Sequence, residues 1–285
     1  MLELGIGADI VRGIGLLIWL AFFACLAFAL WIGKNRRNKV MGAVLVTLLF
    51  IAPAAPGIYR MAVYKHNYAK AKALFDERCK TAGEKVMRRV EGVDGVLLLK
   101  IRPPYANASS HDPMYPGAAL IDESGGDEYI KTFLKYERPR VAGKRSELTE
   151  EPTPLPGYRY VDVVDPTDGK RYRYTASIEK LPFGQKLRLD RVEAPSLQPR
   201  YAVTYDDLVA SEDRKYWIAA TTTKIVDTSD NSIIATSTLY AMEPGQGSPD
   251  GGRQPWTFAQ RCPRSFGSGA TRYFVDQVLQ PIQGR

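Results

Sequence analysis

The sequence predicts an α+β protein with two N-terminal transmembrane helices, a stalk helix and a soluble domain built on an antiparallel sheet. Three observations carry this prediction. Residues 1–60 are almost wholly apolar, and residues 61–90 repeat apolar side chains at intervals of three or four. Further along, short segments rich in Ile, Val, Thr and Tyr alternate in polarity, which is typical of strands. Long alternating strand and helix units are absent, so a wound βαβ fold is not expected.

Composition limits the class of protein. The chain has 285 residues, of which 45% are hydrophobic and 25% charged, and this excludes a disordered chain, a collagen-like repeat and a small disulfide scaffold. Of the net charge of +8, half falls on residues 1–60 and half on the other 225 residues, too dilute for a nucleic-acid partner. With only two histidines, no His-rich metal site is expected, and we expect no cofactor.

Two uncharged stretches define a membrane anchor over residues 1–60. Residues 14–32 and residues 40–58 each contain nineteen residues without a charge. A helix of that length extends about 28 Å, close to the ~30 Å hydrocarbon core of a bilayer. The alternative is a cleaved signal peptide followed by a buried helix, but the chain start lacks a basic segment. We therefore expect a lipid bilayer as one partner and residues 61–285 as the soluble domain.

The charges around these spans predict their orientation. Residues 33–39 carry four basic side chains, whereas the tail before the first span has only Glu3, Asp9 and Arg12. Basic loops stay in the cytoplasm, so both chain ends are expected on the other side. Four basic residues also follow the second span, between Arg60 and Lys72, but we assign them to the folded domain because the first helix usually sets the orientation.

The soluble domain begins with a predicted stalk helix over residues 61–90. Its apolar face is expected to pack on its own domain, with a coiled-coil dimer as the alternative, and the oligomeric state stays open. Helices are also predicted over 127–136 and 271–279, and residues 147–157 form a proline-rich connector. The predicted strands are 93–101, 158–164, 171–178, 201–205, 217–226 and 233–242, with hairpin turns at 165–170 and 227–232.

The cysteines suggest a crosslink. Cys25 lies in the first apolar span and is expected to act there as a small hydrophobe. In an oxidising compartment, Cys79 and Cys262 are most simply one disulfide, although two unrelated buried thiols are the alternative. A bridge closing a loop of about 184 residues would stabilise the fold by at most ~5 kcal/mol in the chain-entropy treatment.

Most catalytic signatures are missing, so no enzyme is expected. The sequence contains no P-loop, no H-E-x-x-H, no C-x-x-C and no G-x-S-x-G. His111 follows Ser109 and Ser110, which leaves a hydrolase as a remote alternative. The four carboxylates of residues 122–128 do not have EF-hand spacing and are expected to form a solvated turn that caps the next helix.

The most unusual stretch is a Gly/Pro-rich loop over residues 242–256. Six Gly or Pro residues precede Arg253, a density that stops both helix and strand. One interpretation is a presented loop in which Arg253 and Trp256 contact a protein partner, since Arg and Trp are favoured at hot spots. The other is a loop whose Trp256 fills its own core.

A resemblance sharpens the functional expectation. The segments Tyr-Trp-Ile-Ala-Ala at 216–220, Ile-Val-Asp-Thr at 225–228, Ile-Ile-Ala-Thr at 233–236, Gly-Gly-Arg-Gln-Pro-Trp at 251–256 and Cys262-Pro263 resemble a poorly characterised group of bacterial inner-membrane-anchored envelope proteins. The resemblance covers roughly residues 158–280 and carries over no functional residue. Some members are encoded near secreted antibacterial effectors, such as those of type VI secretion, which implies immunity proteins.

The functional hypothesis is therefore a membrane-anchored domain in the bacterial periplasm that binds a protein partner. The sharper form is an immunity protein that neutralises a secreted antibacterial effector. The alternative is a structural or assembly subunit of a cell-envelope complex. Neither form needs a cofactor or a catalytic residue.

Overall fold

The computed structural model describes residues 5–105, 107–139, 147–182, 184–264 and 269–282. It divides into two units, Met1–His66 and Asn67–Arg285. The first unit contains the helices α1 (Gly5–Ile32) and α2 (Arg36–Ile51) and the beginning of α3 (Ala55–Cys79). α1 and α2 pack closely as a hairpin. The closeness is evident at Gly42, where an added Cβ would lie only 3.3 Å from the Cβ of Ala29. Small residues permit this kind of approach between helices in membranes.

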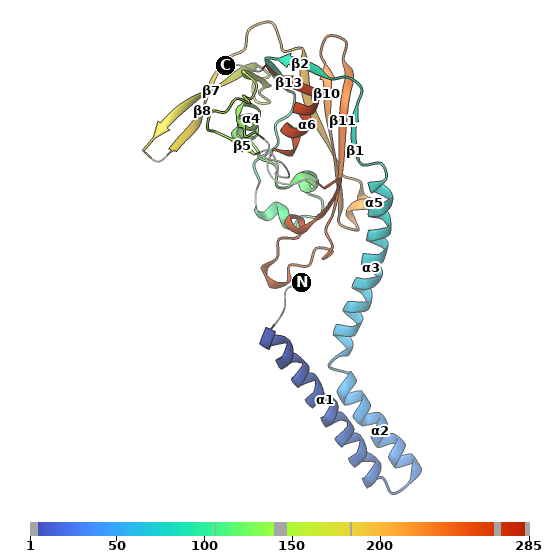
Figure 1. Cartoon of the computed structure of the whole chain (residues 1–285). Helices are drawn as coiled ribbons and strands as arrows, with labels where there is room; N and C mark the ends of the chain where they lie inside the picture. Colours follow the sequence, from blue (N-terminus) through green and yellow to red (C-terminus); the bar gives the residue numbers. More distant parts are fainter. Residues whose placement is uncertain (1–4, 106, 140–146, 183, 265–268, 283–285) are drawn as a thin grey trace. The chain divides into compact units, whose positions relative to one another are not determined.

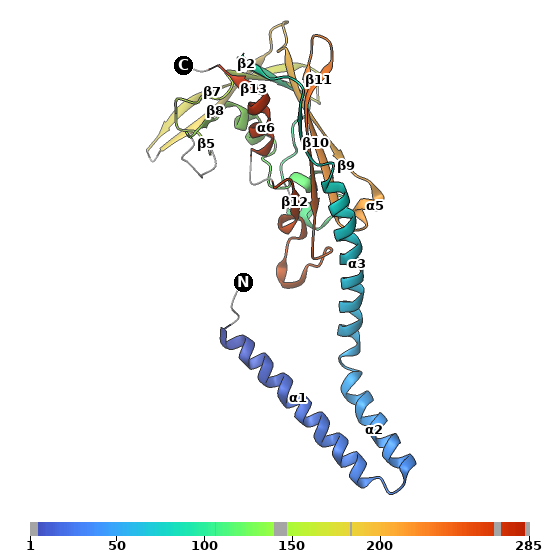
Figure 2. The same cartoon turned by 45° about the vertical axis from the view of Figure 1, so that its right-hand side comes forward.

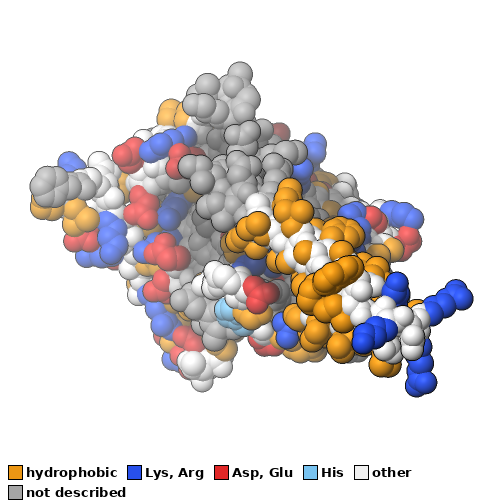
Figure 3. Space-filling model, turned by 90° about the horizontal axis from the view of Figure 1, so that it is seen from below, with side chains coloured by type: hydrophobic (Ala, Val, Ile, Leu, Met, Phe, Trp, Pro, Cys, Tyr) orange, Lys and Arg blue, Asp and Glu red, His pale blue; other side chains and the backbone are white. Residues whose placement is uncertain are grey.

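One helix in the first unit is long and apolar enough to cross a bilayer without a break, and it covers Gly13–Ile32. The second predicted span, residues 40–58, is not one continuous helix. α2 ends at Ile51, α3 begins at Ala55, and the two helices meet at an angle of 60°. Pro53 and Pro56 account for the break, since proline lacks the N–H of a helical hydrogen bond and its ring clashes with the preceding turn. Figure 3 shows the apolar side chains gathered on the helices of this unit, with Lys and Arg side chains at one end.

The stalk helix is shorter than predicted. α3 ends at Cys79 instead of continuing to residue 90, and the strands β1 (Gly83–Val86) and β2 (Val90–Val93) follow it. Gly83, four residues after the end of α3, has a φ of +116°, a conformation that side chains other than glycine rarely adopt and that a continuing helix could not contain. The apolar positions beyond Cys79 that extended the helical pattern therefore belong to strands, and Val86 and Val90 pack against the main core.

The second unit is built around a nine-stranded sheet (Figure 1). Its strand order is β1-β11-β10-β9-β3-β6-β7-β8, with β12 paired to β11. The strands not yet given bounds are β3 (Gly95–Leu98), β6 (Tyr160–Val164), β7 (Arg171–Leu181), β8 (Gly184–Glu193), β9 (Tyr201–Leu208), β10 (Ile218–Asp227), β11 (Ser232–Met242) and β12 (Gln260–Cys262).

The α+β class is confirmed, but the sheet is mixed where an antiparallel one was predicted. β3 lies between β6 and β9 and runs parallel to both, whereas the other pairs are antiparallel. A parallel neighbour requires a long crossover, and residues 99–159 between β3 and β6 supply it. Val96, Leu97 and Leu98 are all buried, as expected for a central strand covered on both faces.

Two helices cover one face of this sheet. α4 (Asp127–Leu134) and α6 (Ala270–Val278) insert apolar side chains into the main core, and Figures 1 and 2 show α6 against the sheet. The core cluster includes Phe133 from α4, Phe274 and Val275 from α6, and Val203 and Ile225 from the sheet.

Shorter elements complete the unit. β4 (Tyr136–Glu137) pairs with β5 (Leu148–Thr149), and β13 (Leu279–Pro281) pairs with β2. The remaining elements are the short helix α5 (Ser211–Arg214) and the 3₁₀ turns η1 (Asn107–His111), η2 (Pro116–Leu120), η3 (Asp250–Gly252) and η4 (Pro255–Phe258).

Candidate functional site

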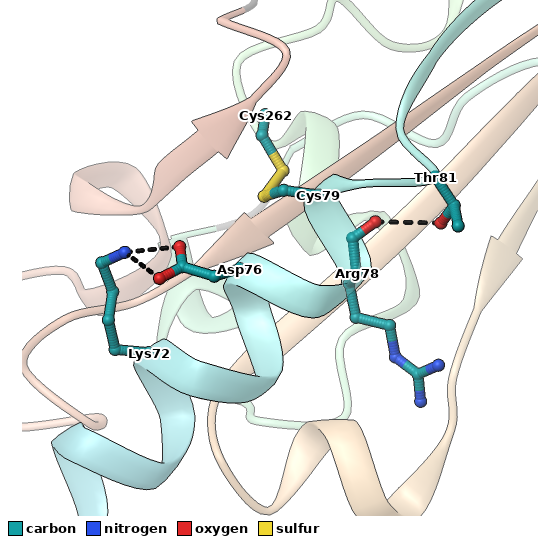
Figure 4. Close-up of a disulfide and its surroundings, with 6 residues drawn as sticks. All are labelled: Lys72, Asp76, Arg78, Cys79, Thr81 and Cys262. Carbon is teal, nitrogen blue, oxygen red and sulfur yellow. Dashed lines mark hydrogen bonds and ion pairs between the residues drawn. A yellow bond between two sulfur atoms is a disulfide. The ribbon is translucent and has the colours of Figure 1, made fainter.

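The disulfide between Cys79 and Cys262 is present in the structure. It joins the last residue of α3 to the end of β12, with the two Cα atoms 5.7 Å apart (Figure 4). Around it, Ala71 and Phe75 of α3 pack against Ile218 and Met242 of the sheet. The end of α3 is thus attached to β12 by a covalent bond and to β10 and β11 by a small apolar core.

The Gly/Pro-rich loop that leads from β11 to β12 is ordered around one buried acid. Glu243 is fully buried, and its carboxylate accepts hydrogen bonds from the backbone N–H groups of Gly245 and Gly247, both at 2.7 Å. The Arg253 guanidinium forms an ion pair with the same carboxylate at 2.5 Å. Arg253 therefore holds the loop closed across its own acid.

Trp256 lies in the core of its own unit, in agreement with the second of the two interpretations of the loop. Its side chain is fully buried, its indole Nε1–H donates to the carbonyl of Asp112 at 2.8 Å, and its ring lies 5.2 Å from that of Trp217. Arg214, also buried, lies over the indole at 5.5 Å. The Trp256 indole has no exposed surface in this structure, so its burial favours the interpretation in which the loop fills its own core. Arg253 retains about a quarter of its side-chain exposure but already has its counter-ion.

A different part of the unit is exposed. The hairpin β7–β8 ends the sheet and extends away from the body of the unit (Figures 1 and 2). Its base is fixed by Asp162 of β6, a fully buried carboxylate that accepts from Arg173 at 2.7 Å and lies 3.4 Å from Arg171. Val192 lies opposite Arg173 at that base, whereas Arg188 and Leu181 lie further along the hairpin. All three side chains are exposed, and the strand register puts them on one face. We call these three residues the hairpin surface.

A cavity of about 260 Å³ opens between β4, β13, α6 and the chain after β5. Its lining residues are Glu137, Leu155, Pro156, Arg272, Asp276, Gln280 and Pro281. The backbone N–H of Glu137 donates to the carbonyl of Leu155 at 2.9 Å, which fixes one wall. Sequence reasoning did not identify this cavity, because its residues come from segments far apart in the chain and form no motif.

Its electrostatics centre on Asp276. Nε of Arg272 donates to both oxygens of this carboxylate at 2.7 Å, and the Arg272 guanidinium lies 4.5 Å from the Tyr158 ring. Burial, with a smaller contribution from the charge of Glu137, raises the pKa of Asp276 to about 6 despite the arginine. Burial also raises the pKa of Tyr158, whose hydroxyl donates to the carbonyl of Leu279.

The other positions singled out in the sequence are His111, with the serine before it, and the acidic segment 122–128. His111 is exposed at the end of η1, whereas Ser110 beside it is buried. Glu123 accepts from the backbone N–H groups of Gly269 and Thr271, so it caps α6 rather than the helix that follows it in sequence. Among the described residues, no group of three His, Cys, Asp or Glu side chains could hold a metal ion.

Comparisons with known families, curated proteins and solved structures find no match for this chain. The arguments about function therefore depend on the geometry described above.

Proposed function

We propose that the chain is a membrane-anchored protein whose second unit lies outside the cytoplasm, in the periplasm of a bacterium, and binds a protein partner there. The disulfide between Cys79 and Cys262 carries this proposal. Thiols of cytosolic proteins are kept reduced, whereas disulfides persist in oxidising compartments. The bond also joins the domain to the helix that follows the anchor, which is a useful place for a crosslink in a tethered protein.

The anchor fits this orientation if the chain crosses the inner membrane twice. The four basic residues of 33–39 favour a cytoplasmic turn after α1. The chain must then return across the bilayer before Asn67, and within the described residues 33–66 this return would be made by α2 with the first residues of α3. The break at residues 52–54 divides this return span near one end, where interfacial water can satisfy the freed backbone groups.

The exposure of the hairpin surface supports the proposal that the second unit binds a protein partner. Val192 is 59% exposed and Leu181 43% exposed, on a hairpin whose strands end the sheet. The sharper proposal is that the partner is a secreted antibacterial effector, which the anchored domain neutralises as it arrives in the periplasm. Membership of an envelope complex is the competing outcome.

Topology is tested with reporters on the full chain. We expect alkaline phosphatase fused at the C-terminus to be active and green fluorescent protein at the same place to be dark. A fusion within residues 33–39 is the matched control and should give the opposite pair of results. A fluorescent C-terminal fusion would overturn the periplasmic placement.

The partner is tested by photo-crosslinking at Val192 in intact cells, followed by mass spectrometry. We expect one effector to be captured during challenge, and we expect deletion of the gene to make cells sensitive to that effector. Equal fitness of the deletion strain in competition would contradict the immunity proposal. Capture of the same envelope proteins in unchallenged cells, in fixed stoichiometry, would support the envelope complex instead.

A further inference from the structure

The cavity between β4, β13 and α6 has an unbalanced negative charge. Arg272 and Asp276 neutralise each other through a two-oxygen contact, and only 1% of the Arg272 side chain is exposed. Glu137 adds a second carboxylate to the lining. Among the described residues, no cation lies within ion-pair distance of Glu137, in contrast to Glu128, which Lys131 and Lys135 neutralise nearby. The cavity therefore contains one carboxylate more than its own residues balance.

The two carboxylates influence each other. The charge of Glu137 contributes to the raised pKa of Asp276, which means that a negative charge on Glu137 disfavours the ionised form of Asp276. A positive group placed between them would remove this repulsion. The Asp276 carboxylate can accept it, because a carboxylate has about four lone-pair positions and Arg272 occupies two.

The walls define the rest of the ligand. Leu155, Pro156 and Pro281 are apolar, and Gln280 adds an amide to the lining. The volume of about 260 Å³ is below the roughly 300–1,000 Å³ typical of pockets for drug-sized molecules. A hydrated metal ion would leave the apolar walls unused, whereas a short hydrocarbon chain with one charged end would use both the walls and the carboxylates.

We propose that this cavity binds an alkylammonium group, with its charge between Glu137 and Asp276 and its hydrocarbon chain against Leu155, Pro156 and Pro281. The group can come from a lysine side chain of another protein or from a free diamine, and both have the same chemistry at the carboxylates. This proposal goes beyond the proposed function and does not depend on the hairpin surface.

The test is titration of the full-length protein in detergent, followed by calorimetry and by the shift of the thermal midpoint. The probes are n-butylammonium and, as a control of matched length and opposite charge, butanoate. We expect saturable binding of n-butylammonium and none of butanoate. Glu137→Gln should weaken the binding by about tenfold or more, since a charge-assisted contact is replaced by a neutral one. Glu179→Gln, on the exposed hairpin, is the matched control and should leave the binding unchanged.

Asp276→Asn distinguishes a local effect from loss of the fold. If this variant melts cooperatively, it should also lose binding, and if it does not, Glu137→Gln alone decides the outcome. Equal binding of n-butylammonium by the wild type and Glu137→Gln, or equal binding of butanoate, would overturn the proposal. Comparison of N-acetyl-lysine methylamide with cadaverine then identifies the source, since the tighter probe indicates a protein lysine or a free diamine respectively.

Discussion

The two ends of the nine-stranded sheet differ in how they are supported. At the β10–β11–β12 end, the sheet is covered by α3, crosslinked by a disulfide and followed by a loop closed on a buried Trp and a buried Glu. At the other end, the hairpin β7–β8 has one fully buried apolar side chain, Leu187, and exposes Leu181 and Val192. Buried apolar area and crosslinks stabilise a fold, whereas exposed apolar side chains on a projecting element are available to a partner.

This difference indicates where a substitution can change partner binding with little effect on the free energy of unfolding. Substitutions at the crosslinked end should change the free energy of unfolding and leave the partner surface intact. Substitutions at the hairpin surface should do the opposite. Each prediction below tests one side of this contrast.

The largest effect is expected from removing the crosslink. Cys262→Ser opens a loop that joins residues 183 positions apart, and the chain-entropy treatment gives a loss of up to about 5 kcal/mol. The measurement is the urea midpoint of the full-length protein with and without reductant. Reductant should lower the midpoint of the wild type towards that of the variant. Cys25→Ser is the control and should unfold like the wild type, and a wild type insensitive to reductant would contradict the prediction.

The next effect concerns the loop after β11. Trp256→Ala should destabilise the fold by about 3–5 kcal/mol, because a fully buried Trp leaves a cavity and its Nε1–H contact is lost. Phe258→Ala, two residues along and 58% exposed, is the matched control and should change the stability by less than about 0.5 kcal/mol. Thermal melts of the two variants decide the matter. Similar melting temperatures for both variants would mean that buried Trp256 does not stabilise this end of the sheet.

A smaller effect is expected in acid at the turn between β10 and β11. Hydrogen bonds from Ser229, together with the Arg200 and Arg88 guanidiniums, lower the pKa of Asp227. A lowered carboxyl pKa contributes stability that is fully present above the ordinary value near 4 and is lost as the pH falls below it. The free energy of unfolding should therefore decline below about pH 4, and Asp227→Asn should show a shallower decline. Parallel pH profiles for both proteins would refute this assignment.

Much of the fold could be predicted from local patterns. The first apolar span, the turns around residues 165–170 and 227–232, and the strands that flank them depend on nearest neighbours in sequence, and the structure places them as expected. The end of α3 could not be predicted from spacing alone, because Val86 and Val90 satisfy both a helical and a strand period. The available signal was the glycine at position 83, since glycine destabilises a helix interior, and in the structure it has a positive φ.

The features missed are those that depend on distant segments. β8 contains Lys186, Arg188, Asp190 and Arg191, so its composition does not favour a strand, and it forms because β7 pairs with it. The cavity combines Glu137 with Asp276, which are far apart in the chain. Trp256 was identified as an anchor residue, but sequence could not decide between a partner and the core, because both environments favour tryptophan.

The smallest effect on stability, and the sharpest test of the contrast, is expected at the hairpin surface. Val192→Glu should change the free energy of unfolding by less than about 0.5 kcal/mol, because Val192 is 59% exposed. It should nevertheless weaken capture of the partner by tenfold or more, since a charge would be buried in an apolar contact at a cost of more than about 1.4 kcal/mol. Leu197→Glu makes the same kind of change at a side chain 83% exposed outside the hairpin and should leave capture unchanged. Equal loss of capture in both variants would assign the partner to a different surface, whereas a large loss of stability in Val192→Glu would show that the hairpin, too, belongs to the supported part of the sheet.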